Sequence, residues 1–165
     1  METTNDYGER QKVWDMIKDI RISIMVTYDE EGNLSSRPMS AHQEEFEGSL
    51  WFFTNVNSLK IDHIEGNQNI LLGYSNPDKN EYVSINGTAE IVRDTEKSKQ
   101  LWSEMLRTWF PKGADDPDIA LIKVNIISAE YWDTPSASMA IAYGYVKARL
   151  TGERAKVGEN KKVMF

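Results

Sequence analysis

The stretch from Trp51 to Lys60, WFFTNVNSLK, combines residue types that could hold a phosphate ester. Its apolar start predicts a strand, and the following helix would begin near Asn57. A helix N-terminus presents free backbone N–H groups to an anion, and the Ser58 hydroxyl and the Lys60 ammonium would lie beside them. The pattern also fits a helix that Asn57 or Ser58 merely caps, with Lys60 in solvent. Spacing alone leaves both interpretations open.

A second cation, Arg37, precedes Pro38 in the strand expected over 34–42. Because proline has no backbone N–H, Pro38 predicts a sheet edge or an irregularity in the ladder. From there the Arg37 guanidinium could reach the same anion. It could equally be an exposed strand arginine that pairs with a nearby carboxylate.

Five tryptophans are more than the core of so small a domain requires, and Trp51, Trp109 and Trp132 each fall near the end of an expected element. Such rings could stack against a planar heterocycle or form the wall of its pocket. Each could instead belong to the core or to a dimer interface. The aromatic residues therefore suggest, but do not define, a ligand site.

The charge balance argues against two classes of partner. The chain has 165 residues and a net charge of −7, so its long-range field repels nucleic acid and anionic membranes. No apolar run approaches the length of about 20 residues that a bilayer requires, and the first residues do not resemble a secretory signal. We therefore expect a cytoplasmic protein that binds neither nucleic acid nor membrane.

The cysteine and histidine content limits the possible chemistry. Cysteine is absent, which excludes disulfides, thiolate catalysis and iron–sulfur ligation, so redox chemistry would require a cofactor. The two histidines, His42 and His63, have no dense acidic cluster beside them, and we expect both on the surface and no metal site.

The elements that position these residues follow from the periodicity of the apolar side chains. Helices are expected over 9–20, 57–65, 94–108 and 138–150, and strands over 21–28, 34–42, 50–53, 69–74, 82–92 and 119–132. Gly66 is expected to close the second helix in the left-handed conformation, and Gly152 to end the last helix.

Short antiparallel strands interrupted by helices favour a mostly β (α+β) fold, an antiparallel barrel with peripheral helices. The first three strands are expected to form a meander. The length predicts a single domain over 1–165, with flexible tails over 1–7 and 153–165.

Five segments, in order, resemble the FMN-binding split-barrel family related to pyridoxamine phosphate oxidase, and more narrowly its general stress protein branch. The segments are Arg37-Pro38-Met39, LWFFTNVNSLK, EYVSINGTAEIV, LWSEMLRTWFPKGADDPDIALIKV and SAEYWD. The resemblance implies a six-stranded antiparallel split β-barrel that acts as a homodimer, with FMN bound in clefts at the subunit interface.

The resemblance also implies roles for individual residues. Ser58 and Lys60 would bind the FMN phosphate, and Arg37 would approach the phosphate or the ribityl chain. The second subunit would bring Tyr82 and Trp132 to the flavin ring. The implied FMN-binding residues are Arg37, Pro38, Met39, Phe52, Phe53, Thr54, Ser58, Lys60, Tyr82, Trp109, Phe110 and Trp132. No catalytic side chain is assigned.

Two departures from the family pattern bear on activity. Leu59 stands where oxidase members have a basic residue between the matching Ser and Lys, and Trp132 is followed by DTPSASMA, without the Arg and His that hold pyridoxal phosphate. Oxidation of pyridoxamine phosphate is therefore not expected. Two functions remain: a flavin-dependent oxidoreductase linked to the stress response, with a small-molecule electron donor or acceptor, or a non-catalytic protein that stores flavin or senses its redox state.

Overall fold

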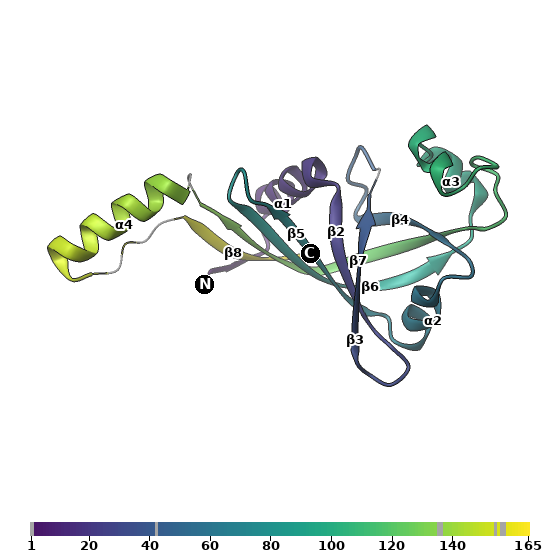
Figure 1. Cartoon of the computed structure of the whole chain (residues 1–165), viewed down its shortest axis with the longest axis horizontal. Coiled ribbons are helices and arrows are strands. Elements are labelled where there is room, and N and C mark those ends of the chain that lie inside the picture. Colours follow the sequence, from purple (N-terminus) through teal and green to yellow (C-terminus); the bar gives the residue numbers. More distant parts are fainter. Residues whose placement is uncertain (1, 42, 135–136, 154, 156–157) are drawn as a thin grey trace.

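The computed structural model describes residues 2–41, 43–134, 137–153, 155 and 158–165. It is a mostly β structure with peripheral helices, as the sequence predicts (Figure 1). The strands are β1 (Glu2–Thr4), β2 (Ile22–Tyr28), β3 (Leu34–Ser40), β4 (Ser49–Asn55), β5 (Asn69–Asn76), β6 (Glu81–Val92), β7 (Ile119–Asp133) and β8 (Glu159–Met164). The helices are α1 (Tyr7–Ile20), α2 (Leu59–Gly66), α3 (Thr95–Gln100), the 3-10 helix η1 (Glu104–Thr108) and α4 (Ala137–Thr151).

The strands form one open sheet in the order β1-β8-β7-β6-β5-β2-β3, with β4 also paired to β7. The first half of β7 pairs with β4 and its second half with β8, while β6 lies along its other side. In the described part of the chain, β3 and β4 form no ladder, and the one bridge near them joins Ala41, the residue after β3, to Phe52. The expected meander is therefore wrong at its third strand, because β4 pairs with β7 rather than with β3.

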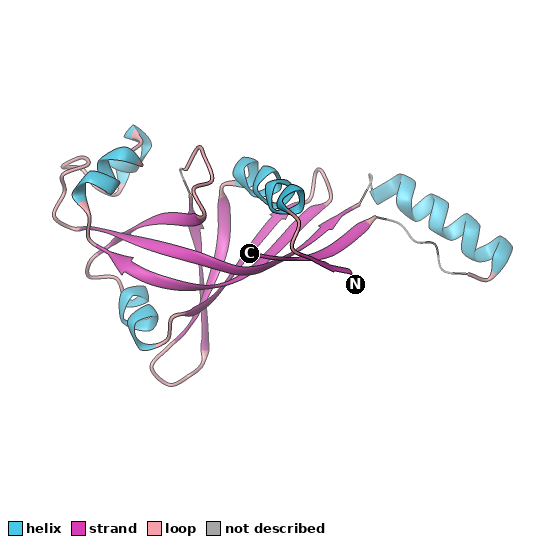
Figure 2. Cartoon of the chain, turned by 180° about the vertical axis from the view of Figure 1, so that it is seen from behind, coloured by secondary structure: helices cyan, strands magenta, loops and turns pink. Residues whose placement is uncertain are grey.

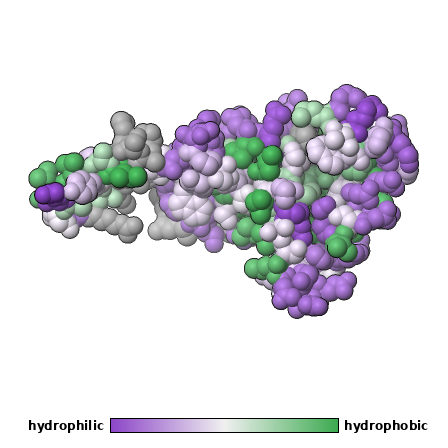
Figure 3. All heavy atoms as spheres, viewed as in Figure 1, coloured by the Kyte–Doolittle hydropathy of each residue, from purple (hydrophilic) through white to green (hydrophobic). Residues whose placement is uncertain are grey.

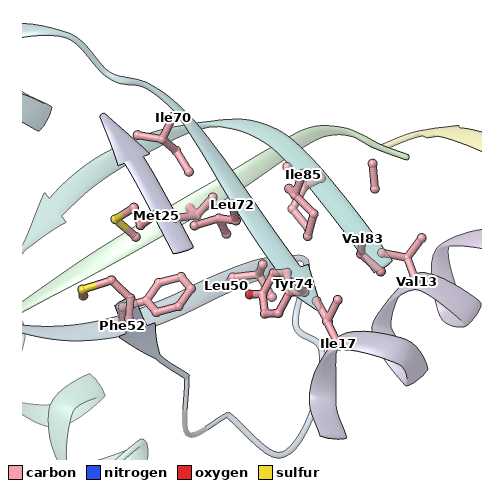
Figure 4. Close-up of a cluster of buried hydrophobic side chains, with 14 of the residues drawn as sticks. Val13, Ile17, Met25, Leu50, Phe52, Ile70, Leu72, Tyr74, Val83 and Ile85 are labelled. Carbon is pink, nitrogen blue, oxygen red and sulfur yellow. The ribbon is translucent and has the colours of Figure 1, made fainter. Parts of the chain in front are cut away.

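The core lies inside the curve of the sheet and is closed by α1. Along β2, Ser23, Met25 and Thr27 are buried, whereas the alternate residues face outward, as strand periodicity requires. Figure 4 shows Val13 and Ile17 of α1 pointing toward the sheet beside a cluster that includes Met25, Leu50, Phe52, Ile70, Leu72, Tyr74, Val83 and Ile85. These residues come from α1 and four strands, and the same cluster also includes Met39 of β3, Ile122 of β7 and Val163 of β8, so the core joins most of the sheet.

The helix expected over 94–108 is interrupted. Asp94 caps it as a helix start should, since its Oδ1 accepts a hydrogen bond from the Lys97 N–H at 3.0 Å, but α3 ends at Gln100 and η1 follows after a gap. The Trp102 ring, which lies in the gap, meets Phe53 edge-on with centroids 6.1 Å apart. Packing against β4 thus overrides the apolar periodicity that predicted one helix.

Gly66 does not adopt the expected left-handed conformation. It is the last residue of α2, and the glycines with positive φ in the described chain include Gly152 but not Gly66. Asn67 continues the helical pattern by donating its N–H to the His63 carbonyl and is itself extended, at φ −149°. The chain therefore passes directly into β5 without a left-handed residue, whereas Gly152 ends α4 as predicted.

Both segments expected to be flexible tails contain paired strands. β8 pairs with β7, and β1 pairs with β8 in parallel, which brings the strand count to eight where the resemblance implies six. The Glu9 carboxylate of α1 accepts hydrogen bonds from the Tyr131 hydroxyl and from Lys161 Nζ, each at 2.7 Å. The partners of 159–164 are distant in sequence, so local polarity gave no sign of this strand.

Glu159 lies between two cations, Lys12 at 2.6 Å and Lys161 at 2.8 Å. Hydrogen bonds from Lys12 and then Lys161 lower the pKa of its carboxyl from 4.5 to about 2. The group's contribution to stability is thus present above pH 4.5 and is lost as the pH falls toward 2.

Glu159→Gln should therefore lower the free energy of unfolding at pH 7 by about 0.5–1 kcal/mol, a small effect because the carboxylate is partly exposed. Urea unfolding at pH 7, 4 and 3 should show the difference between parent and variant shrinking below pH 4.5. A difference that stays constant over that range would contradict the assigned ion pairs.

Helix α4 lies in the connection between β7 and β8. It projects away from the sheet at one end of the molecule's long axis (Figures 1 and 2). Among the described residues, its hydrogen bonds and ion pairs all stay within 137–153. None of the helices described is both long and apolar enough to cross a bilayer.

Candidate functional site

The turn between β4 and α2 carries the first part of the site. Ser58 is the N-cap residue of α2 in extended conformation, yet its side chain makes no capping hydrogen bond. The Ile61 N–H donates to the Ser58 carbonyl at 2.9 Å. The Ser58 hydroxyl therefore lies beside the N–H groups of Leu59 and Lys60, which begin the helix and have no partner within it. The simple capping role that spacing allowed for the Ser58 hydroxyl is thus not what the structure shows.

Arg37 of β3 lies opposite Met25 of β2, two pairs along the ladder from the Ser35–Thr27 pair and so on the same face. Its Nη1 donates a hydrogen bond to Thr27 Oγ1 at 2.7 Å, and its Nη2 donates to Ser35 Oγ at 3.1 Å. These neutral partners hold the guanidinium against the inner wall of the sheet and leave its charge uncompensated. As Pro38 predicts, β3 is the last strand in the order and lies at the sheet edge.

Lys60 brings the second charge to the same place. Its Nζ donates to the buried Thr54 Oγ1 at 3.2 Å. Burial, and then repulsion from Arg37, lower the pKa of the Lys60 ammonium, and burial alone lowers the pKa of Arg37. Across the described residues, no carboxylate comes within 4.0 Å of either group. The exposed ion pair considered for Arg37 is therefore not formed.

Two half-buried cations without a counter-charge destabilise each other, and an anion placed between them would relieve that repulsion. The surrounding donors are hydroxyls and backbone N–H groups, which suit phosphate oxygens. In a chain with net charge −7, this cluster of Arg37, Thr54, Ser58 and Lys60 is a local positive site. We call it the cationic site.

The sequence reading missed two members of this site. His63, expected on the surface, is half-buried in α2, with Nδ1 3.4 Å from both Arg37 Nη2 and Thr27 Oγ1. The spacing in the sequence could have identified His63, because it follows Lys60 by three residues and so lies on the same face of the helix. Thr27 could not be found this way, since it belongs to a different strand. His42 lies outside the described residues.

The remaining candidate residues make no described hydrogen bond with the side chains of the cationic site, although Met39 and Phe52 are next to Arg37 and Thr54 on the same strand faces. Met39 and Phe52 are buried in the core, and Pro38 is exposed on the outer face of the sheet opposite Ile24. Phe53 and Phe110 pack together beside α3 and η1, whereas Trp109 is 65% exposed.

Tyr82 and Trp132 form a cross-strand pair between β6 and β7, each with 37% of its surface exposed. Both lie on the outer face of the sheet. No hydrogen bond or ring contact joins either residue to the cationic site within the described structure, so one chain does not bring them to it.

A separate hollow of about 690 Å³ lies between the end of α1 and the link between α3 and η1. It is lined by Lys18, Asp19, Arg21, Ala41, Gln43, Glu44, Glu45, Glu47, Gln100, Leu101, Trp102 and Ser103. Four of these side chains are acidic and two, Lys18 and Arg21, are basic, so carboxylates predominate. We call it the acidic hollow; it does not include any residue of the cationic site.

Comparison with known proteins gives a consistent picture. The family model described as "Pyridoxamine 5'-phosphate oxidase like" matches residues 8–156. Protein bli-3 of Neurospora crassa is 27% identical over 153 residues, which cover 87% of this chain and 73% of that protein.

Two solved structures share the fold across most of the chain. A candidate general stress protein 26 from Jannaschia sp. CCS1 is 28% identical, with a TM-score of 0.76 over 97% of this chain and 100% of the other. The general stress FMN/FAD binding protein of Xanthomonas citri is 26% identical, with a TM-score of 0.66 over 78% of this chain and 90% of the other.

Proposed function

Because the chain belongs to the pyridoxamine 5'-phosphate oxidase like family, we propose that it binds FMN, with Arg37, Ser58 and Lys60 holding the phosphate. The observation that carries the proposal is the pair of half-buried cations, Arg37 and Lys60, which no described carboxylate neutralises. The name of the Xanthomonas citri relative, which specifies FMN or FAD, supports a flavin as the ligand.

The donor set favours FMN among flavins. A terminal phosphate monoester carries close to two negative charges at neutral pH, which matches two cations together with the N-terminus of α2. Thr27 and Thr54 orient the two cationic side chains through their hydroxyls. Met39 and Phe52 are buried, so in this proposal the backbone near them, rather than their side chains, faces the flavin ring.

We further propose that the site is completed in a homodimer. The outer face of the sheet exposes Ile22, Ile24, Leu71, Tyr82 and Trp132, an apolar surface of the kind that protein interfaces bury. A partner's Tyr82 and Trp132 would then supply the aromatic contacts that one chain does not bring to the site, with Trp109 and Phe110 nearby. In the same proposal, β2 to β7 form the six-stranded split barrel, closed at the Ala41–Phe52 bridge.

A bound flavin supplies electron and hydride transfer, so the protein need only bind and orient it. We assign the chain to the flavin-dependent oxidoreductases, acting with a small-molecule electron donor or acceptor. One observation favours a non-catalytic storage or sensing role instead: the segment after Trp132 carries no Arg or His before Lys147 and continues into α4.

Loading the purified protein with FMN and removing the free flavin tests flavin binding, and reduction of the bound flavin tests turnover. The protein should remain yellow, and anaerobic addition of reduced nicotinamide nucleotide should bleach the flavin absorbance. Retention of colour without bleaching by any common donor would favour storage or sensing. A colourless protein after loading would refute flavin binding itself.

A further inference from the structure

Helix α4 has the composition of a buried helix and the position of an exposed one. Ile141, Tyr143, Tyr145, Val146 and Leu150 are each at least 53% exposed, and the helical period of about 3.6 residues places them on more than one side of the helix. Figure 3 shows apolar residues, in green, on the projecting helix. A helix that is apolar on several sides is normally buried. A 15-residue helix on its own is only marginally stable in water. Tertiary contacts that its own sheet does not provide would therefore stabilise α4.

The charge of α4 differs from that of the rest of the chain. Lys147 and Arg149 are its charged residues, and it contains no Asp or Glu. The acidic hollow offers the complementary charge, with Ala41, Leu101 and Trp102 as apolar lining. Glu44 and Glu45 at the hollow are exposed and form no ion pair with any described residue.

One molecule does not bring its own α4 to its own hollow. A row of paired residues crosses the sheet from Pro38 through Ile24, Gly73 and Ser84 to Glu130. At one end of these strands, β3 leads into Ala41 at the hollow and β7 leads toward α4. The hollow and α4 thus follow strands at opposite edges of the sheet, and in Figure 1 α4 lies at one end of the molecule, α3 at the other and α1 between them.

A second copy resolves this geometry. In a two-fold dimer each copy presents the same two surfaces to the other, so α4 of each copy can contact the hollow of its partner. We infer that α4 of each protomer docks in the acidic hollow of its partner, with Lys147 and Arg149 facing Glu44 and Glu45.

This inference rests on the homodimer of the proposed function but not on flavin binding. The decisive experiment is a charge swap between two variants, Lys147→Glu/Arg149→Glu and Glu44→Lys/Glu45→Lys. Each variant alone places like charges at both contacts, and its dimer dissociation constant should rise by about tenfold or more. In an equimolar mixture both contacts regain opposite charges, so dimers should reform with nearly the parent's affinity.

Sedimentation velocity over a range of protein concentrations would measure these constants, and FMN uptake would be recorded separately. Glu30→Lys/Glu31→Lys is the matched control, because it makes the same charge change on the exposed β2–β3 turn and should leave the dimer unchanged. A monomeric parent, full dimerisation of either swap variant alone, or a mixture that stays monomeric would each overturn the inference. Loss of FMN binding with intact dimers would overturn only the proposed function.

Cross-linking gives a readout that does not depend on affinity. Because the chain has no cysteine, a Lys147→Cys variant mixed with a Glu45→Cys variant can form a mixed disulfide only between two copies. Mild oxidation should give a covalent heterodimer, while Lys147→Cys mixed with Glu30→Cys should give none. Equal yields from the two mixtures would contradict docking at the acidic hollow.

Discussion

Replacing Ser58 and Lys60 together with alanine is expected to weaken FMN binding by about 2–4 kcal/mol, the contribution of two contacts to a charged group. That corresponds to a rise in Kd of roughly 30- to 900-fold. Riboflavin lacks the phosphate, so its affinity for the variant should equal its affinity for the parent. Titrations of both flavins, followed by the quenching of flavin fluorescence, would measure the difference.

Two controls accompany the double variant. Lys112→Ala removes an equal charge from an exposed loop position and should leave both affinities unchanged. Without flavin, the double variant should be at least as stable as the parent, because loss of Lys60 removes its repulsion with Arg37. A double variant that held FMN as tightly as the parent would show that the phosphate is bound elsewhere.

Phe52→Ala is expected to lower the free energy of unfolding by about 3–5 kcal/mol, because it empties a large volume in a packed core. The side chain is fully buried, and the residue pairs with Ile122 of β7 while bridging to Ala41. Removing the ring therefore loosens the junction between β3, β4 and β7. Urea unfolding monitored by tryptophan fluorescence would measure the loss.

The neighbouring Phe53→Ala serves as the comparison. Phe53 is only half-buried, on the opposite side of β4 in the small cluster with Trp102 and Phe110, so its loss should cost less than that of Phe52. If Phe52→Ala left stability unchanged but abolished FMN binding, the ring would be a ligand contact rather than a core residue.

The sequence predicted the local elements well and their pairing poorly. Alternation in β2 and β6 identified strands because one face of each is buried. The pairing of β4 with β7 joins segments far apart in the chain, and no local pattern encodes that choice. The same reason explains β8, whose charged residues look like a polar tail until Lys12 and Glu9 of α1 are placed beside them.

The residues of the candidate site were likewise predictable where a local pattern carries them and not where strand pairing decides their neighbours. Ser58 and Lys60 were found because both follow a strand at the start of a helix, a signature carried by adjacent residues. Arg37 was identified, but the sequence could not show that its neighbours would be hydroxyls instead of carboxylates. That fact depends on the register of β3 against β2, which sets Thr27 beside the guanidinium and decides the electrostatics of the site.

The double partnership of β7 has a consequence for synthesis on the ribosome. β4, with the sequence SLWFFTN, has in the described fold a continuous ladder only with β7. At typical elongation rates, β7 follows β4 by on the order of ten seconds. During that interval an apolar strand has an open edge, the kind of segment that chaperones protect from aggregation. Completion of β7 thus marks the earliest point at which the nascent chain can close its core.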